Sequence, residues 1–225
     1  MNYIKLFEEF TEETLSKNNY EYDNYFRNSK SRSNKVAWSE PRSQIKNFRL
    51  VSKLINENDS VLDYGCGIGD FIRYLDKNKN ISDYLGVDIN SNFINMAKKD
   101  YPDNNFQLIK NVNEIKGKWD SVCAIGVFTW FITKDDFIKT INKLYEVCNK
   151  QVLITCLYDY YVSDSPSYWT SNYRKYNEEL FKELFPEFNK IFRLIVLIFI
   201  PWKGNSLKIK THKHIPKDQT SIFEL

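Results

Sequence analysis

One stretch decides the fold of this chain: Val61-Leu62-Asp63-Tyr64-Gly65-Cys66-Gly67-Ile68-Gly69-Asp70-Phe71. Its first four residues predict the end of a buried strand. The three alternating glycines predict a tight turn, and the spacing of Phe71, Ile72 and Leu75 predicts the start of a helix. Glycine suits such a turn because any side chain would block a sharp bend or the close approach of a ligand. A strand, a glycine turn and a helix start form the usual floor of a nucleoside-binding site in a doubly wound sheet.

A second short apolar run, residues 84–87, ends at Asp88 and Ile89. Asp88 follows the last glycine of the turn by roughly 20 residues, the distance at which the second strand of such a unit presents a carboxylate to ribose hydroxyls. The alternative is that Asp88 caps the helix expected to begin near residues 90–92. The glycine turn and the acid occur in register, and this order of parts predicts a nucleoside site.

Length and composition limit the class of protein. The chain has 225 residues, of which 42% are hydrophobic, which suits one α/β domain with additions better than two independent domains. A formal net charge of +3 argues against a dedicated nucleic-acid binder. The N-terminus lacks the pattern of a secretory signal, and the longest apolar run, residues 194–200, is too short to span a membrane. We therefore expect a cytoplasmic protein without membrane contact.

The four cysteines are scattered along the chain and form no Cys-x-x-Cys pair; they are Cys66, Cys123, Cys148 and Cys156. This spacing predicts neither a metal site nor a disulfide framework. Small buried thiols in a reducing compartment fit the pattern better.

Strands and helices alternate along most of the chain. Apolar runs predict strands over residues 60–64, 84–87, 105–109, 120–125 and 151–157. Helical spacing predicts helices over residues 1–17, 39–56, 70–76, 91–99 and 135–148, while residues 18–38 show no period and predict a loop or short helix. Such alternation implies a parallel sheet with helices on both faces. A turn signal at Gly204-Asn205, between two strand-like runs, predicts a closing antiparallel hairpin.

The Gly-x-Gly-x-Gly spacing, preceded by Asp63 and followed by Asp88, resembles the first motifs of the class I S-adenosylmethionine (SAM) methyltransferases. It differs from the Gly-x-Gly-x-x-Gly of dinucleotide binders. The resemblance covers about residues 60–157. It implies an α/β fold of the Rossmann-like methyltransferase type: a doubly wound, seven-stranded, mostly parallel sheet with an antiparallel C-terminal hairpin. It also implies SAM as cofactor, S-adenosyl-L-homocysteine (SAH) as product, an N-terminal helical lid or cap segment at 1–56 and a methyltransferase domain at 57–225.

The resemblance assigns cofactor contacts to nine positions: Asp63, Gly65, Gly67, Gly69, Asp88, Ile89, Asn111, Val112 and Gly126. At one of them the sequence departs from the family. After the third strand the family commonly has an acid that accepts a hydrogen bond from the adenine amino group, and Asn111 stands here instead. Its amide oxygen can accept the same bond. A lead helix containing Ser43-Gln44 and Phe48 resembles the small-molecule branch of the family, although Asn47 replaces an arginine of that branch.

Residues for the methyl acceptor are expected outside the core sheet. We expect substrate contacts at Tyr25, Trp38, Trp130 and Tyr160. Asp159 is the candidate general base, because it follows the carboxyl end of a strand, where open α/β sheets bind ligands. Tyr158, beside it, is the other candidate catalytic residue. The alternatives are a solvated loop carboxylate at Asp159 and aromatic side chains that only pack.

The class of acceptor stays open at this point. The clustered aromatic residues suggest a flat or apolar small molecule, but they could also stack a nucleobase, so an RNA or nucleotide methyltransferase is an alternative. The run Ile125-Gly126-Val127-Phe128 lacks the Asx-Pro-Pro-aromatic signature of adenine-type DNA enzymes. A SAM-binding accessory protein without catalysis is a further alternative. The sequence does not indicate the oligomeric state.

Overall fold

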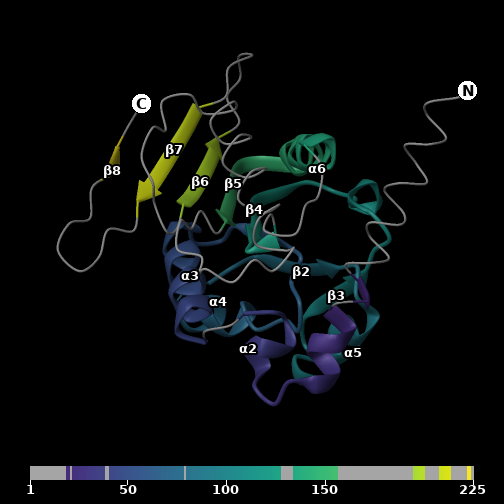
Figure 1. The fold of residues 1–225 in the computed structure, drawn as a ribbon. Coiled ribbons are helices and arrows are strands. Elements are labelled where there is room, and N and C mark those ends of the chain that lie inside the picture. The colour runs from purple at the N-terminus through teal and green to yellow at the C-terminus, as the bar shows by residue number, and fades with distance from the viewer. Residues whose placement is uncertain are drawn as a thin grey trace, which may run out of the picture. The chain divides into compact units, whose positions relative to one another are not determined.

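The computed structural model describes residues 19–20, 22–38, 41–78, 80–127, 134–156, 195–200, 208–213 and 222–223. By the contacts within the chain it divides into two compact units, residues 1–117 and residues 118–225. Each unit contains neighbouring parallel strands with a helix between them in sequence (Figure 1). The α/β class with parallel strands, predicted from the alternation of elements, is thereby confirmed.

The first unit has three parallel strands in the order β3-β2-β1. They are β1 (Ser60–Tyr64), β2 (Asp83–Asp88) and β3 (Asn105–Leu108). Tyr64 pairs with Val87, and Asp88 pairs with Leu108, so the three strands end at one edge. The glycine turn after β1 and the carboxylate at the end of β2 therefore meet at the same edge of the sheet.

Burial explains why these runs form parallel strands. Four of the five residues of β1 are buried, among them Asp63, and the last three residues of β2 are buried too. Parallel strands covered on both faces lack the alternation of half-exposed strands, as β1 does here. The helices that accompany the strands are α2 (Arg32–Lys35), α3 (Pro41–Leu54), α4 (Ile72–Asn78), α5 (Ser91–Asp100) and the 3-10 helix η1 (Val112–Glu114). Helix α5 packs on β2 and β3, and α3 packs on α4.

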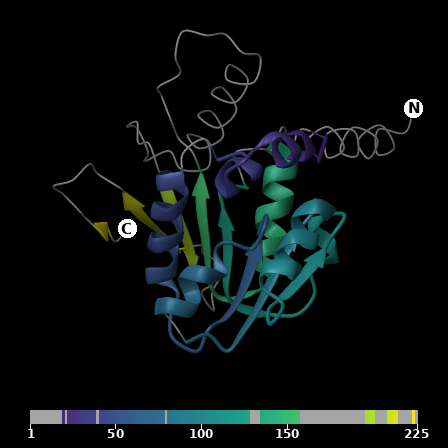
Figure 2. The same cartoon turned by 90° about the horizontal axis from the view of Figure 1, so that it is seen from below.

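The segment before α3 was expected to be a loop or short helix, and its described residues are helical at 19–20, at 22–28 and in α2. In Figure 2 this segment, drawn in purple, lies on the side toward which the arrowheads of β1 and β2 point. The helix predicted over residues 1–17 falls outside the described residues. The predicted start of α4 at residue 70 was two residues early, because the chain remains in a turn through Phe71.

The second unit has the strand order β4-β5-β6-β7-β8. Strands β4 (Trp119–Ile125) and β5 (Cys148–Cys156) are parallel and are connected through α6 (Lys134–Glu146). Strand β6 (Ile195–Ile200) runs antiparallel to β5 and to β7 (Lys208–Lys213), and β8 (Ile222–Phe223) runs antiparallel to β7. Residues 201–207 fall outside the described part, so the terminal hairpin and the total of seven strands stay predictions.

Candidate cofactor site

The turn after β1 has backbone angles that favour glycine. Gly65, Gly67 and Gly69 have φ values of 72°, 54° and 77°. A residue with a Cβ pays about 1–2 kcal/mol in this left-handed region. The amides of Gly65 and Cys66 both donate to the carbonyl of Val87, at 2.8 and 3.0 Å. The turn is therefore fastened to the end of β2, beside Asp88.

The space around the turn also excludes side chains. A Cβ added at Gly67 would lie 2.9 Å from Cγ1 of Val36, which belongs to the N-terminal segment. A Cβ added at Gly69 would lie 2.8 Å from Cζ of Phe106. The turn therefore has room for glycine alone at these two positions, and Val36 of the N-terminal segment lies next to the backbone of Gly67.

Asp88 is buried, with 8% of its surface exposed, and both of its carboxylate oxygens accept backbone hydrogen bonds. Oδ2 accepts from the amide of Gly67 at 2.9 Å, and Oδ1 accepts from the amide of Asn90 at 2.9 Å. Burial raises the pKa of Asp88 to about 6, while these amide donors oppose the rise. A carboxylate has about four acceptor positions, so Asp88 retains acceptor capacity beyond the amides of Gly67, Ile89 and Asn90.

The alternative role of Asp88 as the cap of α5 is wrong. The cap is Asn90, whose Oδ1 accepts from the amides of Asn92 and Phe93 at 2.9 and 3.1 Å. This frees the Asp88 side chain for the turn and for a ligand.

Asp63 lies inside the sheet, with 2% of its surface exposed. The hydroxyl of Tyr84 donates to its Oδ2 at 2.8 Å. Burial raises the pKa of Asp63 to about 7, the Tyr84 hydroxyl lowers it, and the negative charge of Asp88 raises it further. The strands thus hold two carboxyl groups that resist ionisation near the glycine turn.

The raised pKa of Asp63 should make the free energy of unfolding depend on pH. A pKa raised from 3.8 to about 7 means that the folded state binds this proton more tightly than the unfolded chain. The resulting stabilisation is complete below about pH 4 and is lost as the pH rises to about 7. Asp63→Asn keeps an acceptor for Tyr84 and removes the titration. As the pH rises from 4 to 8, the wild type should lose a few kcal/mol of stability that Asp63→Asn keeps, since one pKa unit corresponds to about 1.4 kcal/mol. The free energy of unfolding of the variant, relative to that of the wild type, should therefore increase with pH.

Urea unfolding of both proteins across this pH range measures the difference. A difference that stays constant with pH would show that Asp63 titrates normally.

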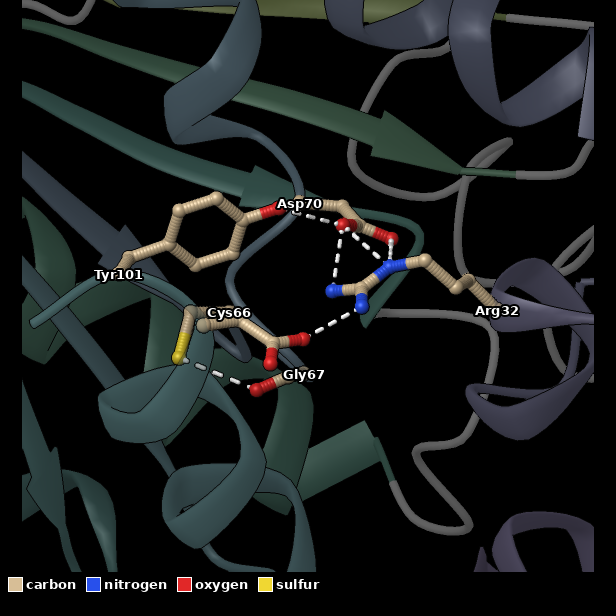
Figure 3. Close-up of polar contacts among 6 residues, drawn as sticks. Arg32, Cys66, Gly67, Asp70 and Tyr101 are labelled. Atoms are coloured by element: carbon tan, nitrogen blue, oxygen red, sulfur yellow. Dashed lines mark hydrogen bonds and ion pairs between the residues drawn. The ribbon is translucent and has the colours of Figure 1, made fainter.

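A charged cluster joins α2 to the site (Figure 3), and no pattern in the sequence indicated it. The Arg32 Nε donates to both oxygens of Asp70, at 2.9 and 3.1 Å, and Nη1 donates to Asp100. The hydroxyl of Tyr101 donates to Asp70 Oδ1 at 2.8 Å. Burial opposes the charge of Arg32, but these carboxylates outweigh it and raise its pKa. Arg32 lies 38 residues before Asp70 in a segment without a period, so no pattern could have linked them.

The remaining predicted cofactor residues fall in both units. Asn111 is exposed and is the N-cap of η1, because its Oδ1 accepts a hydrogen bond from the amide of Asn113 at 3.0 Å. Val112, the first residue of η1, is buried. In the second unit, Gly126 has a φ of 75° and donates its amide to the carbonyl of Thr155 at 2.9 Å. The structure thus places Gly126 directly after β4, as the sequence predicted.

The predicted acceptor residues are only partly described. Tyr25 lies on the helix of residues 22–28 with 43% of its surface exposed, and Trp38 is half-buried. Trp130, Tyr158, Asp159 and Tyr160 fall outside the described residues. Their roles in binding and catalysis stay predictions.

Within the described ranges, no three His, Cys, Asp or Glu side chains gather as a metal site would require. No helix in the same ranges combines the length and apolar character needed to cross a bilayer.

The site defines an α/β protein with a glycine turn and a buried acid at one sheet edge, and comparison with known sequences gives its family. The sequence model of the methyltransferase domain matches residues 38–191, more than half of the chain. The chain therefore belongs to the methyltransferase domain family. The resemblance predicted from the glycine turn and Asp88 is confirmed.

Two relatives share 28% of aligned residues with this chain. One is a protein of Invertebrate iridescent virus 6 whose name assigns it provisionally as methyltransferase 235L; the match spans 113 residues, 50% of this chain and 42% of the relative. The other is the uncharacterised protein RP028 of Rickettsia prowazekii, matched over 112 residues, 43% of this chain and 45% of the relative. The chain spans less than half the length of these curated relatives.

Solved structures show the same fold. The magnesium protoporphyrin IX methyltransferase of Synechocystis PCC 6803 with bound SAH has a TM-score of 0.52 at 13% identity, covering 71% of this chain and 83% of that one. The plantazolicin methyltransferase, in complex with a substrate analogue and SAH, has a TM-score of 0.51 at 21% identity, covering 81% and 77%. A phosphoethanolamine N-methyltransferase of Haemonchus contortus, with phosphoethanolamine and SAH, has a TM-score of 0.54 at 15% identity, covering 64% and 32%. The Rossmann-like methyltransferase fold is thereby confirmed.

Proposed function

We propose that this chain is a SAM-dependent methyltransferase that acts on a small, aromatic or apolar acceptor. The observation that supports the cofactor most strongly is the meeting of the glycine turn with Asp88 at one sheet edge. Membership of the methyltransferase domain family supports the activity. Solved structures of the same fold that contain SAH support the choice of cofactor.

The residues present fit this cofactor. The left-handed glycines leave bare backbone where an aminoacyl chain would pass, and Gly67 is the point at which the turn also touches Asp88. Asp88 would accept the ribose hydroxyls with the acceptor capacity that its backbone donors leave. Asn111 and Val112 would contact the adenine. Asp63, which accepts a hydrogen bond from Tyr84 inside the sheet, would hold the end of β1 that leads into the turn. Bound SAM supplies a methyl group made electrophilic by its sulfonium.

The residues of the protein have to position the methyl acceptor and to exclude water from the reacting groups. Holding an acceptor in line with a reactive carbon can supply up to about 7–11 kcal/mol of the barrier reduction. The lid or cap expected over residues 1–56 would exclude water from the reacting groups. Its residues 22–38 lie against the glycine turn through Val36.

The acceptor is proposed from the aromatic residues expected around the site: Tyr25, Trp38, Trp130 and Tyr160. The solved structures of similar fold include proteins named for small-molecule methylation. Their sequence identity of 13–21% shows a shared fold but not a shared acceptor. Asp159, with Tyr158, remains the proposed general base. We further propose a cytoplasmic location, because buried cysteine thiols such as Cys66 and Cys148 suit a reducing compartment.

Calorimetry with SAH, SAM and NAD tests the cofactor. We expect binding of SAH at a low-micromolar dissociation constant or tighter, and no binding of NAD. Absence of SAH binding would contradict the proposed function. Release of SAH from SAM with a panel of aromatic small molecules and with short RNA then separates the two acceptor classes, and turnover with RNA alone would contradict the small-molecule proposal.

A further inference from the structure

Asn90 uses all of its side-chain hydrogen-bonding capacity at the edge of the proposed ribose site. Its Oδ1 caps α5 by accepting two amides, and its Nδ2 donates to Asn19 Oδ1 at 2.6 Å and to Asp23 Oδ1 at 2.9 Å. Its backbone amide donates to Asp88. A serine or aspartate would cap the helix equally well, but neither has the two amide donors that reach Asn19 and Asp23. The hydrogen bonds to Asn19 and Asp23 therefore explain why position 90 has asparagine and not serine or aspartate.

Asp23 is the acceptor on which this contact converges. Its Oδ1 also accepts from Nδ2 of Asn92 at 2.8 Å. The hydrogen bond from Asn90 is the main cause that lowers the pKa of Asp23, so the carboxylate is charged at neutral pH. Hydrogen bonds to a charged acceptor are stronger than those between neutral groups.

Apolar packing reinforces the same contact. Tyr22 and Phe26 both lie against the ring of Phe93, with centroid distances of 5.5 and 5.9 Å. On the helix of residues 22–28, Phe26 is a neighbour of Tyr22 at i,i+4 spacing and of Asp23 at i,i+3 spacing. These three residues meet the first turn of α5, directly after the site of Asp88.

The chain from residue 22 to residue 38, which we call the strap, makes a second set of contacts at the glycine turn. Arg32 pairs with Asp70 at the end of the glycine turn, and Val36 covers Gly67. The strap thus contacts both the first turn of α5 and the glycine turn. Asp88 has only 8% of its surface exposed while the strap is in place.

We propose that Asp23 and Asn90 are positioning residues that latch the strap beside Asp88 and thereby set the rate at which SAH leaves. This inference rests on the proposed function. The latch holds the strap by hydrogen bonds that must break before the edge of the site at Asp88 becomes accessible. Neither residue is required to touch the reacting atoms.

Two substitutions break the latch from opposite sides. Asp23→Ala removes the acceptor and leaves Asp88 and the cap of α5 intact. Asn90→Ser keeps a capping oxygen and the backbone amide to Asp88 but removes the donors to Asp23. Asn24→Ala, at the adjacent position of the same helix, is the matched control, and Asp23→Asn, which keeps an acceptor oxygen, is the conservative rescue.

Stopped-flow measurement of SAH release gives the first readout. We expect release about tenfold faster in Asp23→Ala and in Asn90→Ser, since the lost bonds involve a charged acceptor. The double variant should release SAH no faster than the faster single one, because residues in one contact act non-additively. Asn24→Ala should match the wild type, and Asp23→Asn should stay within about threefold of it. Unchanged release in both single variants, or multiplied rates in the double, would overturn the latch.

Hydrogen exchange of the ligand-free protein gives a second readout that does not need SAH. The amides of residues 22–28 should exchange about tenfold faster in Asp23→Ala than in Asn24→Ala, by loss of the same bonds. Equal exchange in these two variants would overturn the latch even if SAH binds. If the wild type fails to bind SAH, the cofactor proposal fails, and the exchange result still decides whether the strap is latched.

Discussion

Asp88→Ala should abolish SAH binding. The ionised Asp88 carboxylate would accept two ribose hydroxyls, and hydrogen bonds to charged groups contribute about 1.5–3 kcal/mol each, so the loss should reach about 100-fold or more in the dissociation constant. The variant also leaves the amides of Gly67 and Asn90 without their acceptor, so the turn itself becomes less well held. Calorimetry at pH 7.5, about 1.5 units above the pKa of about 6, measures the effect with the carboxylate ionised.

Asp83→Ala is the matched control, because Asp83 is the exposed acid at the opposite end of the same strand. It should bind SAH as the wild type does. Thermal unfolding of both variants separates lost affinity from lost folding. Binding of SAH by a folded Asp88→Ala protein within about threefold of the wild type, less than the worth of one hydrogen bond, would show that the ribose lies elsewhere.

Gly69→Ala should lower the free energy of unfolding by about 2–5 kcal/mol. Its φ of 77° costs a residue with a Cβ about 1–2 kcal/mol. The new methyl would also lie 2.8 Å from Cζ and 2.9 Å from Cε1 of Phe106, and overpacking of this kind costs about 1–3 kcal/mol. Urea unfolding measures the sum.

Gly117→Ala is the control for the backbone part, because its φ of 84° is similar and it lies in an exposed loop. It should lose only about 1–2 kcal/mol. Adding Phe106→Leu to Gly69→Ala should reduce the penalty of the glycine substitution compared with its effect in the wild type, since a smaller side chain relieves the contact. A Gly69→Ala protein as stable as the wild type would contradict the observed turn.

The local elements of the first unit could be predicted because their signals lie within short stretches of sequence. The strand of residues 60–64 has the predicted bounds, and the glycine turn and Asp88 meet as their spacing indicated. Both depend on features that one short stretch contains: an apolar run, alternating glycines and an acid at the end of the next strand. The resemblance to a known family added the cofactor, which the residues alone left as a nucleoside.

The contacts of the N-terminal segment could not be predicted. Arg32 meets Asp70 across 38 positions and Asp23 meets Asn90 across 67, in a segment without periodicity. No sequence pattern indicated the contact of Asn90 with Asp23, since it depends on a partner that folds back from far away in sequence. Likewise, the sequence left Asp88 open between a ribose contact and the cap of α5, and the hydrogen bonds of Asn90 show that Asn90 is the cap.

A crystal structure of the protein soaked with SAH tests the central claim most directly. We predict that the two ribose hydroxyls lie within hydrogen-bonding distance of the Asp88 carboxylate and that the aminoacyl chain passes over the backbone of Gly65 and Gly67. SAH bound away from this turn, or a turn that stays covered by Val36 while SAH occupies another site, would contradict the account.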